Sequence, residues 1–167
     1  MSISSGYVLS RRTLGAGLGA SLLTGCGASG DDYVQAAAII RRPLDASASD
    51  PFVELVRFAT LAGNGHNTQP WRFERTPAGI DILPDLTRRT PVVDPDDHHL
   101  FVSLGAAAEN LLISAPTMAL VGALSVDSQA SRLSIALETS AADIDPLVEA
   151  IPRRQCTRSV YDGRSPP

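Results

Sequence analysis

Cysteine is scarce in this chain of 167 residues, which contains only Cys26 and Cys156. The two lie far apart in the sequence, so the sequence indicates no framework of disulfides. Basic charge is also limited, because 14 Lys and Arg residues stand against 18 Asp and Glu residues, for a formal net charge of -4. No basic stripe with interleaved aromatic residues is present, which argues against a nucleic-acid partner.

Several catalytic signatures are missing as well. There is no G-x-G-x-x-G loop of a dinucleotide-binding βαβ unit, no G-x-S-x-G elbow and no H-E-x-x-H motif. One segment is rich in possible metal ligands, namely Asp94, Asp96, Asp97, His98 and His99. Adjacent histidines point to different faces of a helix, and acidic residues suit a helix N-terminus. We therefore expect no metal site in this segment.

Long apolar runs are absent too. The longest one near the N-terminus, Leu14 to Leu23, is shorter than the roughly 20 apolar residues that a membrane-spanning helix needs. It follows the pair Arg11-Arg12, and a twin-arginine pair before such a run is typical of an export signal. The alternative is an ordinary secretory signal with a chance arginine pair. Export on the twin-arginine pathway favours a bound cofactor, because this pathway carries folded proteins.

The apolar run ends in Leu23-Thr24-Gly25-Cys26, which resembles the lipobox of a lipoprotein. The resemblance implies that residues 1–26 are a signal and that Cys26 is acylated. A lipid anchor of this kind holds a protein at a membrane without spanning it, since each buried CH₂ contributes about 0.8 kcal/mol. We therefore expect a protein of the cell envelope or periplasm. Cleavage nearby, with loss of Cys26, is the alternative.

The rest of the chain has the composition of a globular protein, with 44% hydrophobic and 19% charged residues. Residues 27–49 are predicted to form a tether and a short helix that ends by Arg42-Pro43. A clearer helix starts at Pro51, with Asp50 as its cap, and stops near Gly63.

Further elements follow in the order hairpin, long helix, strands and short helix. The hairpin strands are expected at 69–76 and 80–83, the long helix from Asp96 or Asp97 to a break at Pro116, the later strands at 121–126 and 133–137, and the last helix at 145–151. The expected buried face of the long helix is Phe101, Leu104, Ala108, Leu111, Leu112 and Ala115. This order predicts an α+β fold.

The most specific signal is the run Gly65-His66-Asn67-Thr68-Gln69-Pro70-Trp71-Arg72-Phe73. It is similar to the N-x-Q-P-W motif of the FMN-dependent nitroreductase family. Pro91-Val92-Val93-Asp94-Pro95, Ser103-Leu104-Gly105-Ala106-Ala107 and the arginine-rich residues 151–164 strengthen the likeness. Together they resemble the Acg-like, FMN-binding branch of that family. Trp71 and Phe73 are alternatively plain core residues of a hairpin.

In that branch two related halves form one chain, and an arginine-rich segment opens the second half. The resemblance implies that residues 50–150 are a nitroreductase-like half-domain and that residues 151–167 begin a second half. It thus implies a truncated product, a fragment or one partner of a split protein. The partner that it suggests is a second copy or a second-half polypeptide.

The resemblance also implies site residues. Asn67 and Gln69 would hydrogen-bond the flavin, and Gly65 and His66 would pass close to its ring. Arg154 and Arg158 would hold the phosphate. These arginines alternatively form a solvated surface run. Two departures from the family pattern stand out, Cys156 in place of Ser or Thr and Gly63-Asn64 in place of a Pro-Ser pair.

The function so implied is an FMN-dependent oxidoreductase that takes hydride from NADH or NADPH and reduces nitroaromatic or quinone-like acceptors. Such chemistry needs no side chain as acid or base, so the sequence indicates no catalytic residue. The alternatives are a flavin-binding or flavin-sequestering protein without turnover, and an inactive fragment.

Overall fold

The computed structural model describes residues 8–9 and 30–156. Arg11, Arg12 and Cys26 of the expected signal lie outside the described residues, as does Arg158.

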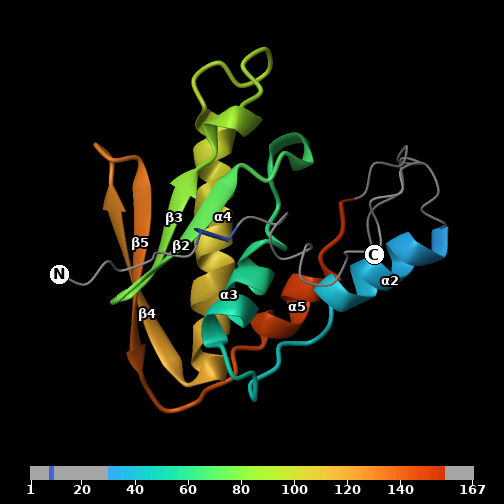
Figure 1. The fold of residues 1–167 in the computed structure, drawn as a ribbon, viewed down its shortest axis with the longest axis vertical. Coiled ribbons are helices and arrows are strands. Elements are labelled where there is room, and N and C mark those ends of the chain that lie inside the picture. The colour runs from blue at the N-terminus through green and yellow to red at the C-terminus, as the bar shows by residue number, and fades with distance from the viewer. Residues whose placement is uncertain (1–7, 10–29, 157–167) are drawn as a thin grey trace, which may run out of the picture.

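A single antiparallel sheet forms one layer of the structure (Figure 1). Its strand order is β1-β2-β3-β5-β4, so two hairpins stand side by side and meet where β3 pairs with β5. The strands are β1 (Val8–Leu9), β2 (Trp71–Thr76), β3 (Gly79–Pro84), β4 (Leu120–Asp127) and β5 (Arg132–Thr139).

Helices form the second layer. Helix α4 runs behind the sheet, α3 lies beside α4, and α5 lies between α3 and the outlying α2 (Figure 1). The helices are α2 (Gly30–Ile40), α3 (Pro51–Ala59), α4 (His98–Ser114) and α5 (Leu147–Arg153). Short 3₁₀ turns occupy Gly65–Asn67, Leu86–Arg88 and Ala115–Met118. Mixed helices and an antiparallel sheet confirm the predicted α+β class.

Most helix boundaries follow the sequence signals, although α3 ends at Ala59 rather than near Gly63. The Asp50 carboxylate accepts a hydrogen bond from the Phe52 N–H, with Pro51 at the first helical position of α3. Helix α4 ends at Ser114, and a 3₁₀ turn continues through Pro116, as the proline predicts. Helix α5 runs to Arg153, beyond the predicted end at Ile151.

The predicted buried face of α4 was wrong at Phe101, which is 43% exposed. The buried stripe runs instead through Leu100, Ser103, Leu104, Ala107, Ala108, Leu111 and Ser114. Two of these positions carry serines, which a hydrophobic pattern does not assign to a core. Each serine hydroxyl donates to the carbonyl one turn back, Ser103 to His99 and Ser114 to Asn110. With its donor satisfied in this way, a serine can be buried at low cost.

The main core lies between the sheet and α4. Trp71, Phe73, Ile80, Ile82 and Ile135 project from the sheet and are all nearly inaccessible to solvent. Helices α3 and α4 cover them. The hairpin aromatics are therefore core residues, as one of the two interpretations of the sequence had it.

One helix of the described residues, His98–Met118 with its 3₁₀ extension, is long and apolar enough to span a membrane by length and composition. Its buried face packs against the sheet and α3. The core position of α4 explains its apolar character without a membrane.

A smaller core fixes α5 on α3. Phe58 and Leu61 from α3 and the turn after it pack against Val148 and Ile151 of α5. Ile40, at the end of α2, adds to this cluster. The ends of α2 and α5 are thus both held on α3.

A buried ion pair on α3 also holds the end of α2. Arg57 donates to both carboxylate oxygens of Glu54, and its remaining N–H groups reach the carbonyls of Ile40, Arg42 and Pro43. These carbonyls belong to the end of α2 and the segment after it, where helical partners run out. Arg42 completes the cluster with an ion pair to Glu54.

The same contacts set the charge state of Glu54. Burial by itself would raise the pKa of this carboxyl group. Hydrogen bonds from Arg57, the Asp45 N–H and Arg42 outweigh burial and lower the pKa from 4.5 to about 2. The carboxylate is therefore ionised in the folded protein over the whole physiological range.

We predict that Gly79→Ala destabilises the protein strongly. A Cβ at Gly79, whose φ is +155°, would lie 2.1 Å from the Ile135 carbonyl oxygen and push β3 away from β5. The matched control is Gly105→Ala on α4, where a Cβ meets nothing within 4 Å. There, alanine should stabilise by about 0.5–1 kcal/mol. Urea unfolding followed by circular dichroism measures the unfolding free energy of both variants. Equal values for the two variants would contradict the close packing of β3 on β5.

We also predict that Glu54→Ala costs about 3–5 kcal/mol of unfolding free energy, because it leaves Arg57 as an uncompensated buried charge. The exposed pair Glu149–Arg153 supplies the control, since Glu149→Ala should cost less than about 1 kcal/mol.

The pH dependence has a defined sign. Folding lowers the pKa of Glu54, so the ionised carboxylate stabilises the folded protein. This stabilisation is complete above pH 4.5 and is lost as the pH falls toward about 2. The difference in unfolding free energy between the native chain and Glu54→Gln should therefore decrease as the pH falls through this range. A difference that stays constant from pH 5 to pH 2 would rule out the ionised pair.

Candidate functional site

The loop of residues 64–69 has an unusual backbone. His66, Asn67 and Gln69 adopt left-handed φ values of 51°, 56° and 53°. Such a conformation costs residues other than glycine on the order of 1–3 kcal/mol, least for Asn, and persists only where the surroundings hold it. A left-handed Gln69 also explains why β2 begins at Trp71, two residues later than predicted.

Hydrogen bonds hold this loop. Asn64 accepts from the Gln69 N–H at 2.8 Å through Oδ1 and donates to the Ala62 carbonyl through Nδ2. The Gly65 N–H donates to the Ser103 hydroxyl at 3.3 Å, which ties the loop to α4. These bonds thus fix both ends of the loop.

Two hollows lie on opposite sides of the 64–69 loop. Gly65, His66 and Thr68 line the first hollow, whereas Asn64, Asn67 and Gln69 line the second. Their volumes are about 270 Å³ and about 330 Å³. The first volume lies just below, and the second at the lower end of, the range of about 300–1,000 Å³ for small-molecule sites. The loop is therefore a shared wall between two hollows.

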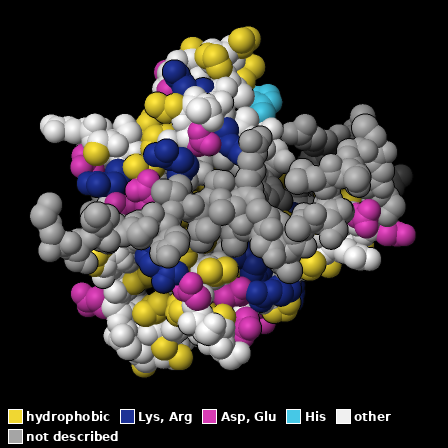
Figure 2. Space-filling view, in the orientation of Figure 1, with side chains coloured by type: hydrophobic (Ala, Val, Ile, Leu, Met, Phe, Trp, Pro, Cys, Tyr) yellow, Lys and Arg dark blue, Asp and Glu magenta, His cyan; other side chains and the backbone are white. Residues whose placement is uncertain are grey.

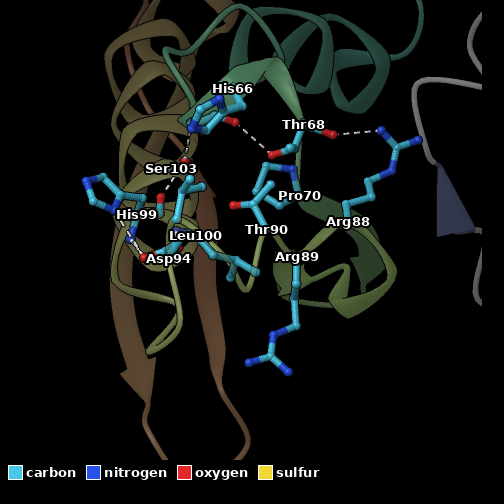
Figure 3. A pocket seen from close by; sticks show the side chains of 12 residues that line it. His66, Thr68, Pro70, Arg88, Arg89, Thr90, Asp94, His99, Leu100 and Ser103 are labelled. Atoms are coloured by element: carbon cyan, nitrogen blue, oxygen red, sulfur yellow. Dashed lines mark hydrogen bonds and ion pairs between the residues drawn. The ribbon is translucent and has the colours of Figure 1, made fainter.

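The first hollow has an acid at its base (Figure 3). Asp94 is 4% exposed and accepts the backbone N–H groups of His99 and Leu100, each at 3.0 Å. The His99 Nδ1 lies 3.1 Å from the same carboxylate. Burial opposes ionisation of Asp94, but these hydrogen bonds prevail and lower its pKa.

The role of Asp94 follows from these partners. Its carboxylate caps the first turn of α4, where N–H groups lack helical partners. Arginines on the far side of the first hollow are likewise engaged, Arg88 with Asp85 and the Thr68 carbonyl, and Arg89 with Asp97. Among residues 30–156 no cluster of three or more His, Cys, Asp or Glu could hold a metal ion.

The second hollow is built from four segments. Helix α2 contributes one face, the end of α3 contributes Thr60 and Leu61, the 64–69 loop contributes amides, and the chain after α5 contributes Arg154. Arg154 donates from Nε to the Leu61 carbonyl at 3.0 Å and from Nη1 to the Cys156 sulfur at 3.1 Å. Its Nη2 makes no hydrogen bond to a described residue.

Gln69 offers a second open group in this hollow. The residue is only 8% exposed. Its Nε2 makes a long contact of 3.4 Å to Asn67 Oδ1, and its Oε1 accepts no hydrogen bond from any described residue. The Gln69 amide therefore borders the hollow with its oxygen free of hydrogen bonds to the described residues.

The structure thus places the site residues expected from the sequence in two groups. Asn67, Gln69 and Arg154 line the second hollow together, although Arg154 is far from the other two in sequence. Gly65 and His66 line the first hollow, on the other side of the loop.

Sequence reasoning did not find Asn64, Tyr33 or Arg41, which also line the second hollow. Asn64 carried a signal, because it departs from the family pattern. Tyr33, Ala37 and Arg41 share one face of α2 by their spacing, but this is a weaker signal of a site. No residue of α2 is buried, so its sequence does not show which face meets the rest of the protein.

Comparison with known proteins gives a family-level likeness. No family model matches the chain. The chain is 30% identical over 124 residues to "Putative NAD(P)H nitroreductase Rv3131" of Mycobacterium tuberculosis strain H37Rv. The same figures hold for "Putative NAD(P)H nitroreductase MT3217" of strain CDC 1551.

The match covers 66% of this chain and 35% of each relative. The chain therefore spans about a third of the length of the curated relatives that it matches. This similarity supports, at family level, a distant relation to proteins named as nitroreductases.

Proposed function

We propose that this chain supplies an FMN site of an NAD(P)H-dependent oxidoreductase of the nitroreductase type, of the Acg-like branch. The observation that supports it is the convergence of Asn67, Gln69 and Arg154 on one hollow with open polar groups. An amide pair suits the polar edge of a flavin, and a guanidinium suits its phosphate. FMN, when bound, supplies the hydride chemistry that transfers electrons from NADH or NADPH to a nitroaromatic or quinone-like acceptor.

The protein's own residues would orient that group. Gln69 Oε1 is free to accept from a ring N–H, and Asn67 holds the Gln69 amide in place. Arg154 is positioned by its bond to the Leu61 carbonyl, which leaves Nη2 for an anion. The Cys156 thiol, in contact with Arg154, is a weaker donor than a hydroxyl, so the phosphate end depends chiefly on arginine.

The second hollow is small for a flavin, and we propose that another polypeptide completes it. The partner would be a second copy of this chain, so that the purified chain can form the whole site. Hydrophobic side chains gather at the end of the molecule where the loop between β3 and α4 lies (Figure 2). These exposed residues are Leu86, Val92, Val93, Phe101 and Val102. Apolar surface of this kind is typical of a protein interface.

We further propose that the chain is exported by the twin-arginine pathway and anchored through lipid on Cys26. The support is the pair Arg11-Arg12, the short apolar run and the lipobox-like Leu23-Thr24-Gly25-Cys26.

We predict that the purified full-length chain binds FMN and that Arg154→Ala weakens this binding tenfold or more. The same change should leave riboflavin binding unchanged, because riboflavin lacks the phosphate. Gln69→Ala should weaken the binding of both flavins, since it removes a contact to the ring. Flavin fluorescence titration measures each affinity.

The matched control is Arg153→Ala, because Arg153 is adjacent in sequence but 76% exposed and paired with Glu149. It should bind FMN as the native chain does. A native chain that binds neither flavin would overturn the proposal, as would equal losses for the two arginine variants. Bound FMN that neither NADH nor NADPH bleaches would favour a flavin-sequestering protein without turnover.

A further inference from the structure

Helix α2 has a largely exposed face. None of its residues is buried, and Tyr33 is 76% exposed. Even so, one face of this helix lines the second hollow, with Tyr33, Ala36, Ala37, Ile40 and Arg41 at helical spacing. The end of this face contacts the body of the protein through Ile40 and Arg41, and the rest of the face borders the hollow.

The position of this face is fixed from one end. Arg57 binds the Ile40 carbonyl, and Ile40 packs into the small core of α3 and α5. Arg41 Nη1 donates to the carbonyls of Pro152 and Arg154 at 2.8 Å and 2.7 Å. Arg41 thereby sets the end of α2 beside the chain that carries Arg154. The helix projects away from the body from this anchor (Figure 1).

The two sides of the hollow have complementary chemistry. The 64–69 loop and Arg154 present amides and a guanidinium, while α2 presents a phenol ring and two alanines. Alanines permit the close approach of a flat group, and an aromatic ring stacks well on another π-system. A planar heteroaromatic ring with a polar edge and an anionic tail fits between two such walls.

We propose that α2 is the second wall of the flavin site, with Tyr33 stacked on the flavin ring and Ala36 and Ala37 in contact with it. This inference rests on the proposed FMN site and adds a ligand-binding helix to it. Tyr33 here binds the ligand, whereas Arg41 is a positioning residue for the segment that follows α5.

The test is FMN binding by the full-length chain and three variants of α2. Tyr33→Ala should weaken FMN binding about tenfold and raise the fluorescence of the bound flavin, because a stacked phenol quenches it. Tyr33→Phe should keep the affinity, since the ring remains. Ala37→Leu should weaken binding at least tenfold by filling the hollow. Circular dichroism confirms that each variant is folded.

The control is Val34→Ala, because Val34 is 64% exposed on α2 and does not line the hollow. It should bind FMN as the native chain does. If the native chain binds FMN but Tyr33→Ala and Ala37→Leu match the control, α2 is not a wall and the FMN site stands without it. If the native chain binds no FMN, both proposals fail.

Discussion

The buried pair of Glu54 and Arg57 on α3 is the contact on which the second hollow depends. Arg57 binds three carbonyls at the end of α2 and just after it, so it sets the start of one wall. The same helix carries Phe58, which packs against α5. This contact positions α5 and therefore Arg154, which follows it in the chain. The end of α3 leads into the 64–69 loop. All sides of the second hollow are therefore positioned by α3. The main core fixes the position of α3 itself.

The 64–69 loop adds a second constraint, because one short segment separates two hollows. Gly65, His66 and Thr68 face one hollow and Asn64, Asn67 and Gln69 face the other, so a backbone shift of the loop changes both hollows. Left-handed residues make such a loop costly to form, and bonds to Asn64 and Ser103 hold it.

Much of the fold follows from local sequence signals. Asp50-Pro51 starts α3, Pro116 stops α4, and the turn before Gly79 joins the first hairpin. The buried face of α4 followed in part, because Leu104, Ala108, Leu111 and Ala115 are buried as predicted. Ser103 and Ser114 were not predicted, since they satisfy their hydroxyls within the helix and so occupy core positions that hydrophobicity assigns elsewhere. Hydrophobic periodicity alone cannot predict a buried serine whose hydroxyl donates to a carbonyl of its own helix.

The candidate site was predictable only through the motif, and only in part. The likeness to nitroreductases indicates Asn67, Gln69 and Arg154, which do lie together. It also groups Gly65 and His66 with them, but the left-handed backbone turns those two to the other side of the loop. The contribution of α2 depends on long-range contacts of Arg41 and Arg57, which no local pattern reveals.

Amide hydrogen exchange of the full-length chain, with and without FMN, tests most directly whether the second hollow is one ligand site. We expect added FMN to slow exchange in three separate segments, the 64–69 loop, α2 and the end of α5, while the β4–β5 hairpin is unchanged. Protection confined to the first hollow, around Asp94 and His99, would contradict a flavin bound between α2 and the loop. So would exchange that FMN leaves unaltered throughout.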